Sequence, residues 1–521
     1  MRLTKVPFDK TKSFSDFFLD YIQQKEQLKP FYERFPSPDS FGDQLMEKKK
    51  NYPLSHRKVL VETLTEQYKG LTISDSVSGN LELLKSENTF TIVTGHQLNI
   101  CTGPLYFIYK IVTVINACKD LKKKYPDFNF IPVYWMASED HDYEEIKSFR
   151  LFGKKYTWNT QQNGAVGRFS TEGLPELVST LPQSGNIFKE AYKKNKKLSE
   201  AVRFYVNALF KDDGLIVIDG DSRPLKSLFT EIIKDDVFNH TAKKLVDDTN
   251  SKLEALGYKV QVHCREINFF YLDENLRSRI EKKDDYEVLD SDIYFEDASI
   301  TKAIEGSPEK FSPNVILRPL YQEIVLPNLA YVGGPAEMVY WLQLKSVFDH
   351  YKILFPILLP RNFGLILENH VSKKLQKTGL DITDFFEGKN FLFNHWIVKN
   401  SNHNLSVHEE MELIRQVFEK LKQRAENIDV TLVPFVGAES KRFQNSLERV
   451  EQKMLRAEKR KQEDKLRQIE AVKDHLFPNG ALQERVDNFL NFSSSDPLFI
   501  RNLVDALDPF DFQFNVLTYD S

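Results

Sequence analysis

Two patterns of apolar residues alternate through the first three quarters of the chain. Short runs rich in β-branched and aromatic residues predict strands. These runs occupy residues 90–94, 128–137, 215–221 and 353–360, and another precedes Gly333. Between them, apolar residues at helical spacing occupy residues 105–124, 187–210 and 224–240. Strands that alternate with helices are typical of parallel sheets, so the pattern predicts an α/β core.

Other stretches have a less regular pattern. Residues 1–88 are interpreted as helical, with no strand among them. Residues 146–170 alternate aromatic, basic and glycine residues and are expected to form antiparallel hairpins inserted between sheet units. Short strands are predicted at residues 258–262 and 268–272, before a charged region, 274–309, that we interpret as a small inserted module.

Near residue 400 the pattern changes to that of a coiled coil. Apolar residues recur in a four-three alternation flanked by charged residues, first in residues 407–428 and again in residues 438–475. The two seams consist of Val407, Met411, Ile414, Phe418, Leu421, Ala425 and Ile428, and of Phe443, Leu447, Val450, Met454 and Ala457. With a turn at residues 429–437, the simplest structure is an antiparallel helical hairpin. Because such seams often pair with a second copy, we expect a homodimer.

These patterns divide the chain into three parts. Residues 1–400 are expected to form the α/β core, residues 401–477 the coiled-coil hairpin, and residues 478–521 a segment that packs back on the core. A chain of 521 residues exceeds the size at which one hydrophobic core stops growing, so more than one domain is expected.

Composition excludes several classes of protein. A hydrophobic fraction of 41% and a charged fraction of 28% are those of a globular protein, and no segment approaches the ~20 apolar residues of a membrane span. A net charge of -4 disfavours a general nucleic-acid-binding protein. Three cysteines, Cys101, Cys118 and Cys264, predict neither a disulfide framework nor a metal site. With no apolar signal segment, we expect a cytoplasmic protein without a membrane or nucleic-acid partner.

A glycine-containing loop follows the first predicted strand of the sheet and leads into an apolar helix. Loops at the carboxyl ends of parallel strands bind ligands in α/β proteins, and a helix N-terminus attracts anions. An ordinary connection that binds nothing is the alternative. The candidate binding residues of this loop and helix are Gly95, His96, Gln97, Thr102, Gly103, Tyr106 and Lys110.

The second predicted strand ends in the densest acid and base cluster of the chain. Glu139, Asp140, His141 and Asp142 follow it directly, and Glu144 and Glu145 come next in the sequence. Repulsion and burial raise carboxylate pKa values towards neutrality, so the cluster suits a general base or the binding of an ammonium group. A solvated acidic loop is the alternative. No second histidine lies at ligand spacing, so no metal is predicted.

A third polar cluster surrounds a strand, a Gly-Gly-Pro turn and a helix at residues 312–343. Arginine binds carboxylate or phosphate bidentately, although a structural salt bridge is its more common role. The candidate binding residues are Asn314, Arg318, Gln322, Gly333, Gly334, Glu337, Tyr340 and Trp341, together with Arg361 at the end of the last predicted strand.

Several motifs in order carry a resemblance that covers the whole chain. They are residues 94–110 with the core TGPLY, the strand end VYWMASEDHDYEE, SPNVILRP, LAYVGGPAEMVYW, and LFPNGALQERVDNF after the coiled coil. In these motifs the chain resembles the cysteine-adding enzymes, or cysteine ligases, of bacillithiol biosynthesis. The resemblance implies a Rossmann-like core with inserted connecting segments, similar to class I aminoacyl-tRNA synthetases, and a dimerising coiled coil. It also implies a reaction: the carboxyl of L-cysteine forms an amide with the amine of glucosaminyl malate, which gives bacillithiol, a low-molecular-weight thiol.

The implied chemistry assigns roles to the candidate residues. The family often has glutamine where this chain has His96 and an apolar residue where it has Cys101, which disfavours a catalytic role for either. A carboxylate must be activated before it condenses with an amine, so ATP is expected, although the chain has no Walker motif. The Gly95–Pro104 loop is expected to bind phosphate or the substrate carboxylate. Asp140, His141 and Asp142 are assigned to deprotonating or orienting the amine, and Arg318 and Arg361 to malate or phosphate groups.

Two other functions remain open at this point. One is a nucleotidyltransferase or metal-assisted hydrolase that uses the same edge of the sheet. The other is a non-catalytic assembly protein in which the coiled coil is the working part.

Overall fold

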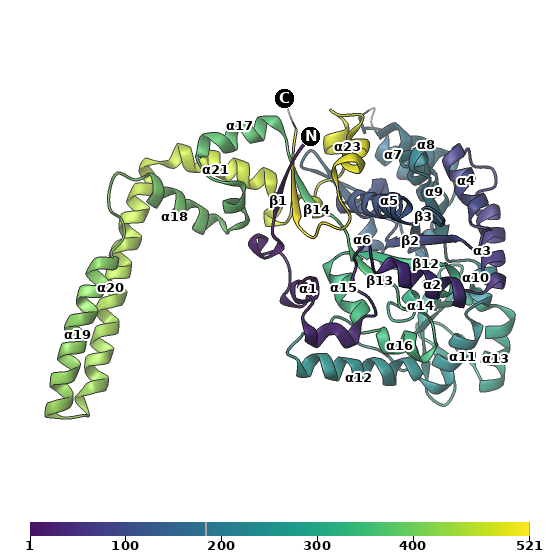
Figure 1. Cartoon of the computed structure of the whole chain (residues 1–521), viewed down its shortest axis with the longest axis horizontal. Coiled ribbons are helices and arrows are strands. Elements are labelled where there is room, and N and C mark those ends of the chain that lie inside the picture. Colours follow the sequence, from purple (N-terminus) through teal and green to yellow (C-terminus); the bar gives the residue numbers. More distant parts are fainter. Residues whose placement is uncertain (183–184, 520–521) are drawn as a thin grey trace.

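The core of the protein is a five-stranded parallel sheet (Figure 1), in a computed structural model that describes residues 1–182 and 185–519. The strands lie in the order β13 (Ile357–Pro360), β12 (Asn328–Gly333), β2 (Thr89–His96), β3 (Asn129–Met136) and β6 (Ile216–Asp219). All four neighbouring pairs are parallel, which confirms the predicted α/β core. Both faces are buried: Ile92 packs in a cluster with Val114, whereas Val93 packs on the opposite side with Leu60.

Helix α5 (Tyr106–Lys124) connects β2 to β3 and completes the predicted βαβ unit. In the register of these strands Gly95 pairs with Trp135, and His96 pairs with Met136. The two strands therefore end at the same level. This register brings the loop after β2 and the acidic segment after β3 to one edge of the sheet.

A second, antiparallel sheet takes three of its strands, β8, β9 and β10, from the charged region at residues 274–309. Its strands lie in the order β10 (Tyr294–Phe295), β9 (Tyr286–Val288), β8 (Leu276–Lys282), β7 (Phe269–Asp273) and β11 (Phe311–Pro313). The prediction of a strand at residues 258–262 is wrong, because these residues form no strand. The backbone N–H groups of Gln261 and Val262 donate instead to the side-chain oxygen of Gln343, at 2.9 and 3.2 Å.

Residues 146–170 contain one hairpin rather than several, formed by β4 (Ser148–Leu151) and β5 (Lys154–Thr157). Beyond it the chain passes close to the end of β3. The N–H of Gly167 donates to the carbonyl of Ser138 at 2.8 Å, and a Cβ at Gly167 would lie 2.5 Å from the Cβ of Ser138. A side chain at position 167 would prevent this close approach. The glycine therefore serves a contact with the end of β3, not the second hairpin that the sequence predicted.

A three-stranded sheet joins the two ends of the chain, in the order β1 (Arg2–Val6), β15 (Phe514–Thr518) and β14 (Phe363–Leu367). Strand β15 is antiparallel to β1 and parallel to β14. The helical interpretation of residues 1–88 missed β1, whose burial pattern lacks the alternation that marks a half-buried strand.

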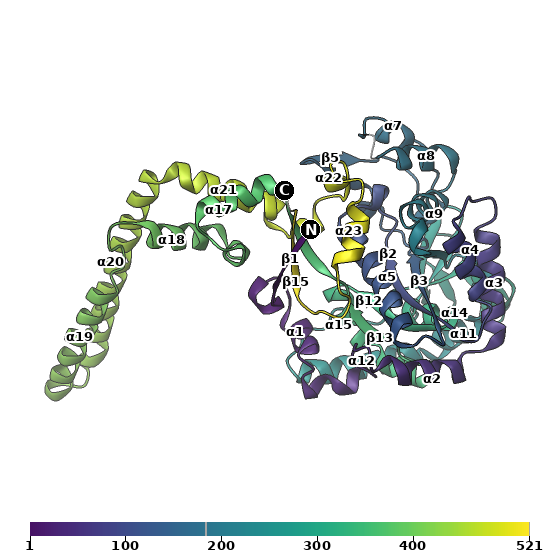
Figure 2. The same cartoon turned by 45° about the horizontal axis from the view of Figure 1, so that its top comes forward.

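The coiled coil projects from the core as a long antiparallel hairpin of α19 (His408–Ile428) and α20 (Leu432–Lys461), shown in Figures 1 and 2. The rings of Phe418 and Phe443 lie 5.4 Å apart across the predicted seam. The turn is shorter than predicted, because the Asp429 carboxylate accepts a hydrogen bond from the Thr431 N–H at 2.8 Å and α20 begins at the next residue. The second helix is also interrupted at Gln462, after which α21 (Glu463–Leu476) returns to the core.

The remaining helices pack around the sheets and at the base of the hairpin. They are α1 (Asp16–Ile22), α2 (Phe41–Asn51), α3 (Leu54–Gln67), α4 (Asp75–Leu83), α6 (Tyr143–Ile146), α7 (Leu174–Val178), α8 (Asn186–Lys194), α9 (Leu198–Leu209), α10 (Arg223–Ser227), α11 (Thr230–Asn239), α12 (Thr241–Ala255), α13 (Asp297–Gly306), α14 (Arg318–Val325), α15 (Pro335–Leu342), α16 (Lys345–His350), α17 (Asn369–Thr378), α18 (Lys389–Asn400), α22 (Leu490–Ser493) and α23 (Phe499–Ala506). Among the described residues, no helix combines the length and apolar character needed to cross a bilayer.

Candidate functional site

A cavity of about 400 Å³ opens at the carboxyl edge of the parallel sheet. Its walls come from the loop after β2, the segment after β3, strand β8, the stretch before α14, the first turns of α15, and the C-terminal segment. Cavities at this edge are the usual ligand sites of open α/β sheets. The position of the cavity therefore makes it the candidate active site.

The end of β2 supplies one wall, where Gly95 lies beside Tyr331 and Arg318. A Cβ at Gly95 would lie 3.4 Å from the Tyr331 hydroxyl and 3.5 Å from an Arg318 nitrogen. The next wall residue, Gln97, donates a 2.5 Å hydrogen bond to Asp140. The two strand ends that the sequence predicted to be neighbours are thus joined by a side-chain contact.

His96 also lines the cavity, but as a neutral imidazole. Its ring packs against Tyr106 and Phe107, with ring centroids 5.2 Å apart in each pair. Burial, helped by the positive charge of Lys110, lowers the pKa of His96 to about 3. The side-chain Nε2 is shielded from solvent and makes no hydrogen bond.

An ion pair at the cavity joins the two helices that follow the neighbouring strands β2 and β12. Lys110 of α5 lies 2.6 Å from Glu337 of α15, and its ammonium also donates to the Gly95 carbonyl at 2.8 Å. Glu337 accepts further hydrogen bonds from the Tyr331 hydroxyl and the Gly334 N–H, at 2.6 and 2.8 Å. Burial would raise the pKa of Glu337, but the charge of Lys110 and these donors hold it below its ordinary value.

Asp140 is the central carboxylate of the acidic wall. Burial alone would raise its pKa, yet the charge of Arg277 and the bond from Gln97 lower it, so Asp140 stays ionised. The Arg277 guanidinium is 3.6 Å from Asp140 and lies over the Phe270 ring, 4.0 Å from its centroid. The expectation that repulsion would raise the pKa of every carboxylate in this cluster is therefore wrong for Asp140.

The two residues that follow Asp140 in the sequence, His141 and Asp142, do not line the cavity. His141 is exposed and contacts Arg277 through Nδ1 at 2.5 Å, and burial of part of its ring together with that cation lowers its pKa. Asp142 caps helix α6 by accepting a hydrogen bond from the Glu145 N–H at 3.2 Å. Asp140, His141 and Asp142 were predicted to deprotonate or orient the amine, and of these three residues Asp140 is the one that lines the cavity.

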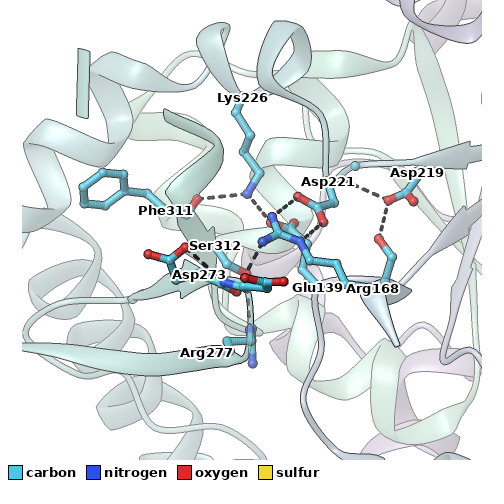
Figure 3. Close-up of polar contacts among 12 residues, drawn as sticks. Glu139, Arg168, Asp219, Asp221, Lys226, Asp273, Arg277, Phe311 and Ser312 are labelled. Atoms are coloured by element: carbon cyan, nitrogen blue, oxygen red, sulfur yellow. Dashed lines mark hydrogen bonds and ion pairs between the residues drawn. The ribbon is translucent and has the colours of Figure 1, made fainter. Parts of the chain in front are cut away.

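Behind the acidic wall lies a buried ionic network (Figure 3). The Lys226 ammonium, completely buried, donates to the Glu139 carboxylate and to the Phe311 carbonyl, the latter at 2.9 Å. Arg168 holds Asp221 bidentately at 2.7 and 2.8 Å. Burial raises the pKa of Glu139, and the positive charge of Lys226 opposes part of that rise at the cavity wall.

The cavity lining also contains arginines. The Arg318 side chain donates to Gln322 at 3.1 Å and to the Tyr340 hydroxyl at 3.3 Å, and it forms no ion pair with a carboxylate of the described residues. Arg361 differs, because its guanidinium forms a buried bidentate pair with Glu484 at 2.5 and 3.1 Å. Arg318 is therefore the better anion-binding group of the two.

Most of the predicted site residues surround this cavity, although their roles stay predictions. Those in the wall are Gly95, His96, Gln97, Tyr106, Lys110, Glu139, Asp140, Asn314, Arg318, Gly334, Glu337, Tyr340 and Arg361. The others lie outside the wall: His141, Asp142, Thr102, Gly103, Gln322, Gly333 and Trp341. Gln322 and Trp341 support wall residues from behind, since Gln322 bonds Arg318 and the Trp341 ring stacks on Tyr331 at 4.4 Å.

The predicted phosphate loop is covered by the C-terminal segment. The Leu105 N–H, at the start of α5, donates to the Asp487 carbonyl at 2.7 Å, and the Asn488 side chain donates to the carbonyls of Cys101 and Gly103. Thr102 and Gly103 thus face other protein groups rather than the cavity. Cys101 is buried, and burial raises the pKa of its thiol, as suits a structural residue.

Sequence reasoning missed cavity residues that come from distant parts of the chain. Arg277 lies in the charged region interpreted as an inserted module, and Arg485 lies after the coiled coil. Glu145 belongs to the recognised acidic segment but had no assigned role; partial burial and the charges of Asp142 and Asp140 raise its pKa. Arg485 lies in the motif LFPNGALQERVDNF, which is one of the motifs of the family resemblance and could have marked this arginine as a candidate.

Comparison with known proteins gives a consistent match along the chain. Residues 1–362 match the family described as bacillithiol biosynthesis BshC, N-terminal Rossmann-like domain, and residues 364–519 match the BshC C-terminal coiled-coil domain. A relative from Flavobacterium johnsoniae is 43% identical over 97% of both chains. One from Cytophaga hutchinsonii is 40% identical over 99% of both chains. Each of these relatives has the name "Putative cysteine ligase BshC".

Proposed function

Because the chain belongs to the bacillithiol biosynthesis BshC family, we propose that it is a cysteine ligase that forms an amide bond in that pathway. The finer proposal names the substrates: the carboxyl of L-cysteine is joined to the amine of glucosaminyl malate, in the step that gives bacillithiol. This function accounts for a cavity that must hold carboxylates and amines side by side.

The distribution of charge in the cavity is the observation that carries the proposal. The cavity lining combines the carboxylates Glu139, Asp140 and Glu145 with cations, among them Lys110, Arg277 and Arg318. Both substrates carry an amino group, and both carry carboxylates. An acidic wall suits the two amines, whereas the guanidinium of Arg318 suits the malate carboxylates.

The reaction needs both activation and proton removal. The C–N bond forms when the neutral amine attacks the cysteine carbonyl and a carboxyl oxygen leaves with its activating group. Asp140, held ionised by Arg277, would bind the incoming ammonium. Glu145, at the rim of the same wall, has a raised pKa and would accept the proton.

ATP is our proposed activator of the carboxyl group. The N-terminus of α5 does not fit its phosphates, because the Leu105 N–H is already bonded to Asp487. The groups that fit a polyanion are the cavity cations, Arg318 and the exposed Arg485. Product formation with and without ATP, together with identification of the ADP or AMP released, tests this part.

Asp140 and Asp142 offer a matched pair of variants for the central test. Asp140→Asn removes the charge from the cavity wall, and kcat/KM for glucosaminyl malate should fall by about 100-fold or more. Asp142→Asn makes the same chemical change two residues away, outside the cavity, and kcat/KM should stay within a few-fold. Equal effects of the two variants, or no ligase activity of the wild-type protein with cysteine, glucosaminyl malate and ATP, would refute the proposal.

We also propose that the coiled coil pairs with a second copy of this chain. Helix α19 presents a stripe of exposed apolar side chains, Leu413, Val417 and Leu421, which are 62%, 54% and 41% exposed, so Leu421 is less covered than its predicted place in the seam required. Exposed apolar residues at intervals of four on a long helix are typical of an interhelical contact. Covering this stripe requires another apolar helix face, which a symmetric partner supplies.

A further inference from the structure

A cluster of two histidines and a glutamate lies at the base of the coiled coil, outside the cavity. Glu368 immediately precedes α17, His370 is in its first turn, and His475 is near the end of α21. The two helices run side by side there (Figure 1). One ligand atom from each of the three side chains lies within 4.8 Å of the other two.

The spacing of the cluster is close to that of a metal site. A carboxylate oxygen of Glu368 is 3.2 Å from Nε2 of His475, and the rings of His370 and His475 have centroids 5.5 Å apart. Ligand atoms of a tetrahedral zinc site are about 3.4 Å apart, given bond lengths of about 2.1 Å. The Glu368–His475 pair is already close to this separation, and the exposed His370 can reach it by turning its side chain.

His475 has a nitrogen that lacks a hydrogen-bond partner. Its Nε2 is shielded from solvent and lies 3.2 Å from a Glu368 carboxylate oxygen, but has no hydrogen-bond partner among the described residues. Shielded polar nitrogens normally have a partner, and a bound cation would supply one.

The donor set indicates which cation fits. Imidazole nitrogens favour Zn²⁺ and neighbouring transition metals, whereas Mg²⁺ and Ca²⁺ prefer oxygen. Two histidines and one glutamate leave a fourth position for water or a small ligand. Glu368 and His370 also line a second cavity of about 710 Å³, with Lys373 and Tyr519, so that position would be accessible.

We infer that Glu368, His370 and His475 bind one Zn²⁺ ion, which fastens α17 to α21 where the coiled coil joins the core. The site draws its ligands from residues far apart in the sequence, and within the described parts of the chain these three residues are the one group whose atoms converge in this way. Because the site is separate from the catalytic cavity, it does not depend on the proposed ligase function.

Calorimetric titration of ZnCl₂ into the full-length, EDTA-treated and dialysed protein tests the inference. One Zn²⁺ should bind per chain, excess Mg²⁺ should not compete, and Co²⁺ should give the visible absorption of a tetrahedral site. His370→Gln and His475→Gln should each weaken Zn²⁺ binding by about 10-fold or more, as expected for loss of one ligand. His403→Gln, a change of an exposed histidine elsewhere in the same domain, should bind as the wild type does.

A thermal-unfolding measurement separates loss of the site from loss of the fold. Zn²⁺ should raise the Tm of the wild type and of His403→Gln, but not that of His370→Gln. Because the His370 side chain is exposed, its replacement should leave the fold intact, so a missing Tm shift would reflect loss of the metal ligand. Failure of the wild type to bind Zn²⁺, or equal affinity in the wild type and both ligand variants, would overturn the inference.

Discussion

The ammonium of Lys110 lies 2.6 Å from a carboxylate oxygen of Glu337, and this pair joins the helices that follow two neighbouring parallel strands. The Lys110 side chain is 4% exposed and that of Glu337 is 26% exposed. Removal of one charge from a buried ion pair leaves the other charge without a partner and poorly solvated, which destabilises the fold. The pair therefore connects the stability of the sheet edge with the electrostatics of the cavity.

Replacement of the lysine tests this connection. Lys110→Met leaves Glu337 without its cation, and the free energy of unfolding should fall by about 3 kcal/mol in urea titrations. Lys123→Met on the exposed side of the same helix should change it by less than about 0.5 kcal/mol, because its pair with Asp120 is in water. Similar losses of unfolding free energy in the two variants would show that the buried pair stabilises the fold no more than the exposed pair does.

Arg318 should determine the affinity for the malate part of the proposed substrate. Its guanidinium faces the cavity without a carboxylate partner, so Arg318→Gln removes an unneutralised cation. The KM for glucosaminyl malate should rise by about 10-fold or more, while the KM for cysteine stays within a few-fold. Arg318→Lys should recover part of the loss, since it restores charge but not the bidentate geometry. A change in the KM for cysteine alone would contradict the assignment.

Lys226 should act as a positioning residue through Glu139. Without the buried ammonium the pKa of Glu139 should rise further, because burial already raises it. In Lys226→Met the acid limb of the pH profile of kcat/KM should therefore move to higher pH. Lys345→Met is the control, because Lys345 is a partly buried lysine paired with Glu33 and does not line the cavity. An unchanged pH profile in Lys226→Met would indicate that the lysine is needed for folding alone.

His96 should make the protein sensitive to acid. Its pKa is about 3 in the folded protein and about 6.5 in an unfolded chain, so the unfolded state binds one more proton between these values. The stabilising contribution of the neutral ring is complete above about pH 6.5 and is lost as the pH falls. Between about pH 7.5 and about pH 5.5, urea titrations should show that the wild type loses about 1 kcal/mol more than His96→Gln. Parallel losses in the two proteins would contradict the low pKa.

The order of the elements along the chain was sufficient to predict which strand ends meet. Strands at residues 90–94 and 128–137 were separated by one helix, and a right-handed crossover makes such strands neighbours. The contact between Gln97 and Asp140 follows from that local connection. The parallel sheet and the coiled coil were predictable for the same reason: each depends on a periodicity that repeats over many residues.

Groups that reach the cavity from distant segments were not predictable. Arg277 is on an antiparallel strand whose position depends on how a whole second sheet packs. Glu484 neutralises Arg361 across 123 positions of sequence, and no pattern in one chain specifies such a pair. The metal ligands His370 and His475 were likewise missed, because spacing rules detect ligands on one helix or loop and not on two helices that pack together.

The exposed stripe of α19 leads to the last prediction, on the state of assembly. If Leu413, Val417 and Leu421 meet the same residues of a second copy, Val417→Glu places two carboxylates in an apolar contact. Burial of charge without a partner costs several kcal/mol, so the dissociation constant should rise by about 100-fold or more. Gln416→Glu adds the same charge at the neighbouring exposed position and should leave the dimer intact. Sedimentation equilibrium at micromolar concentration measures both, and a monomeric wild type or a fully dimeric Val417→Glu would exclude this stripe as the dimer contact.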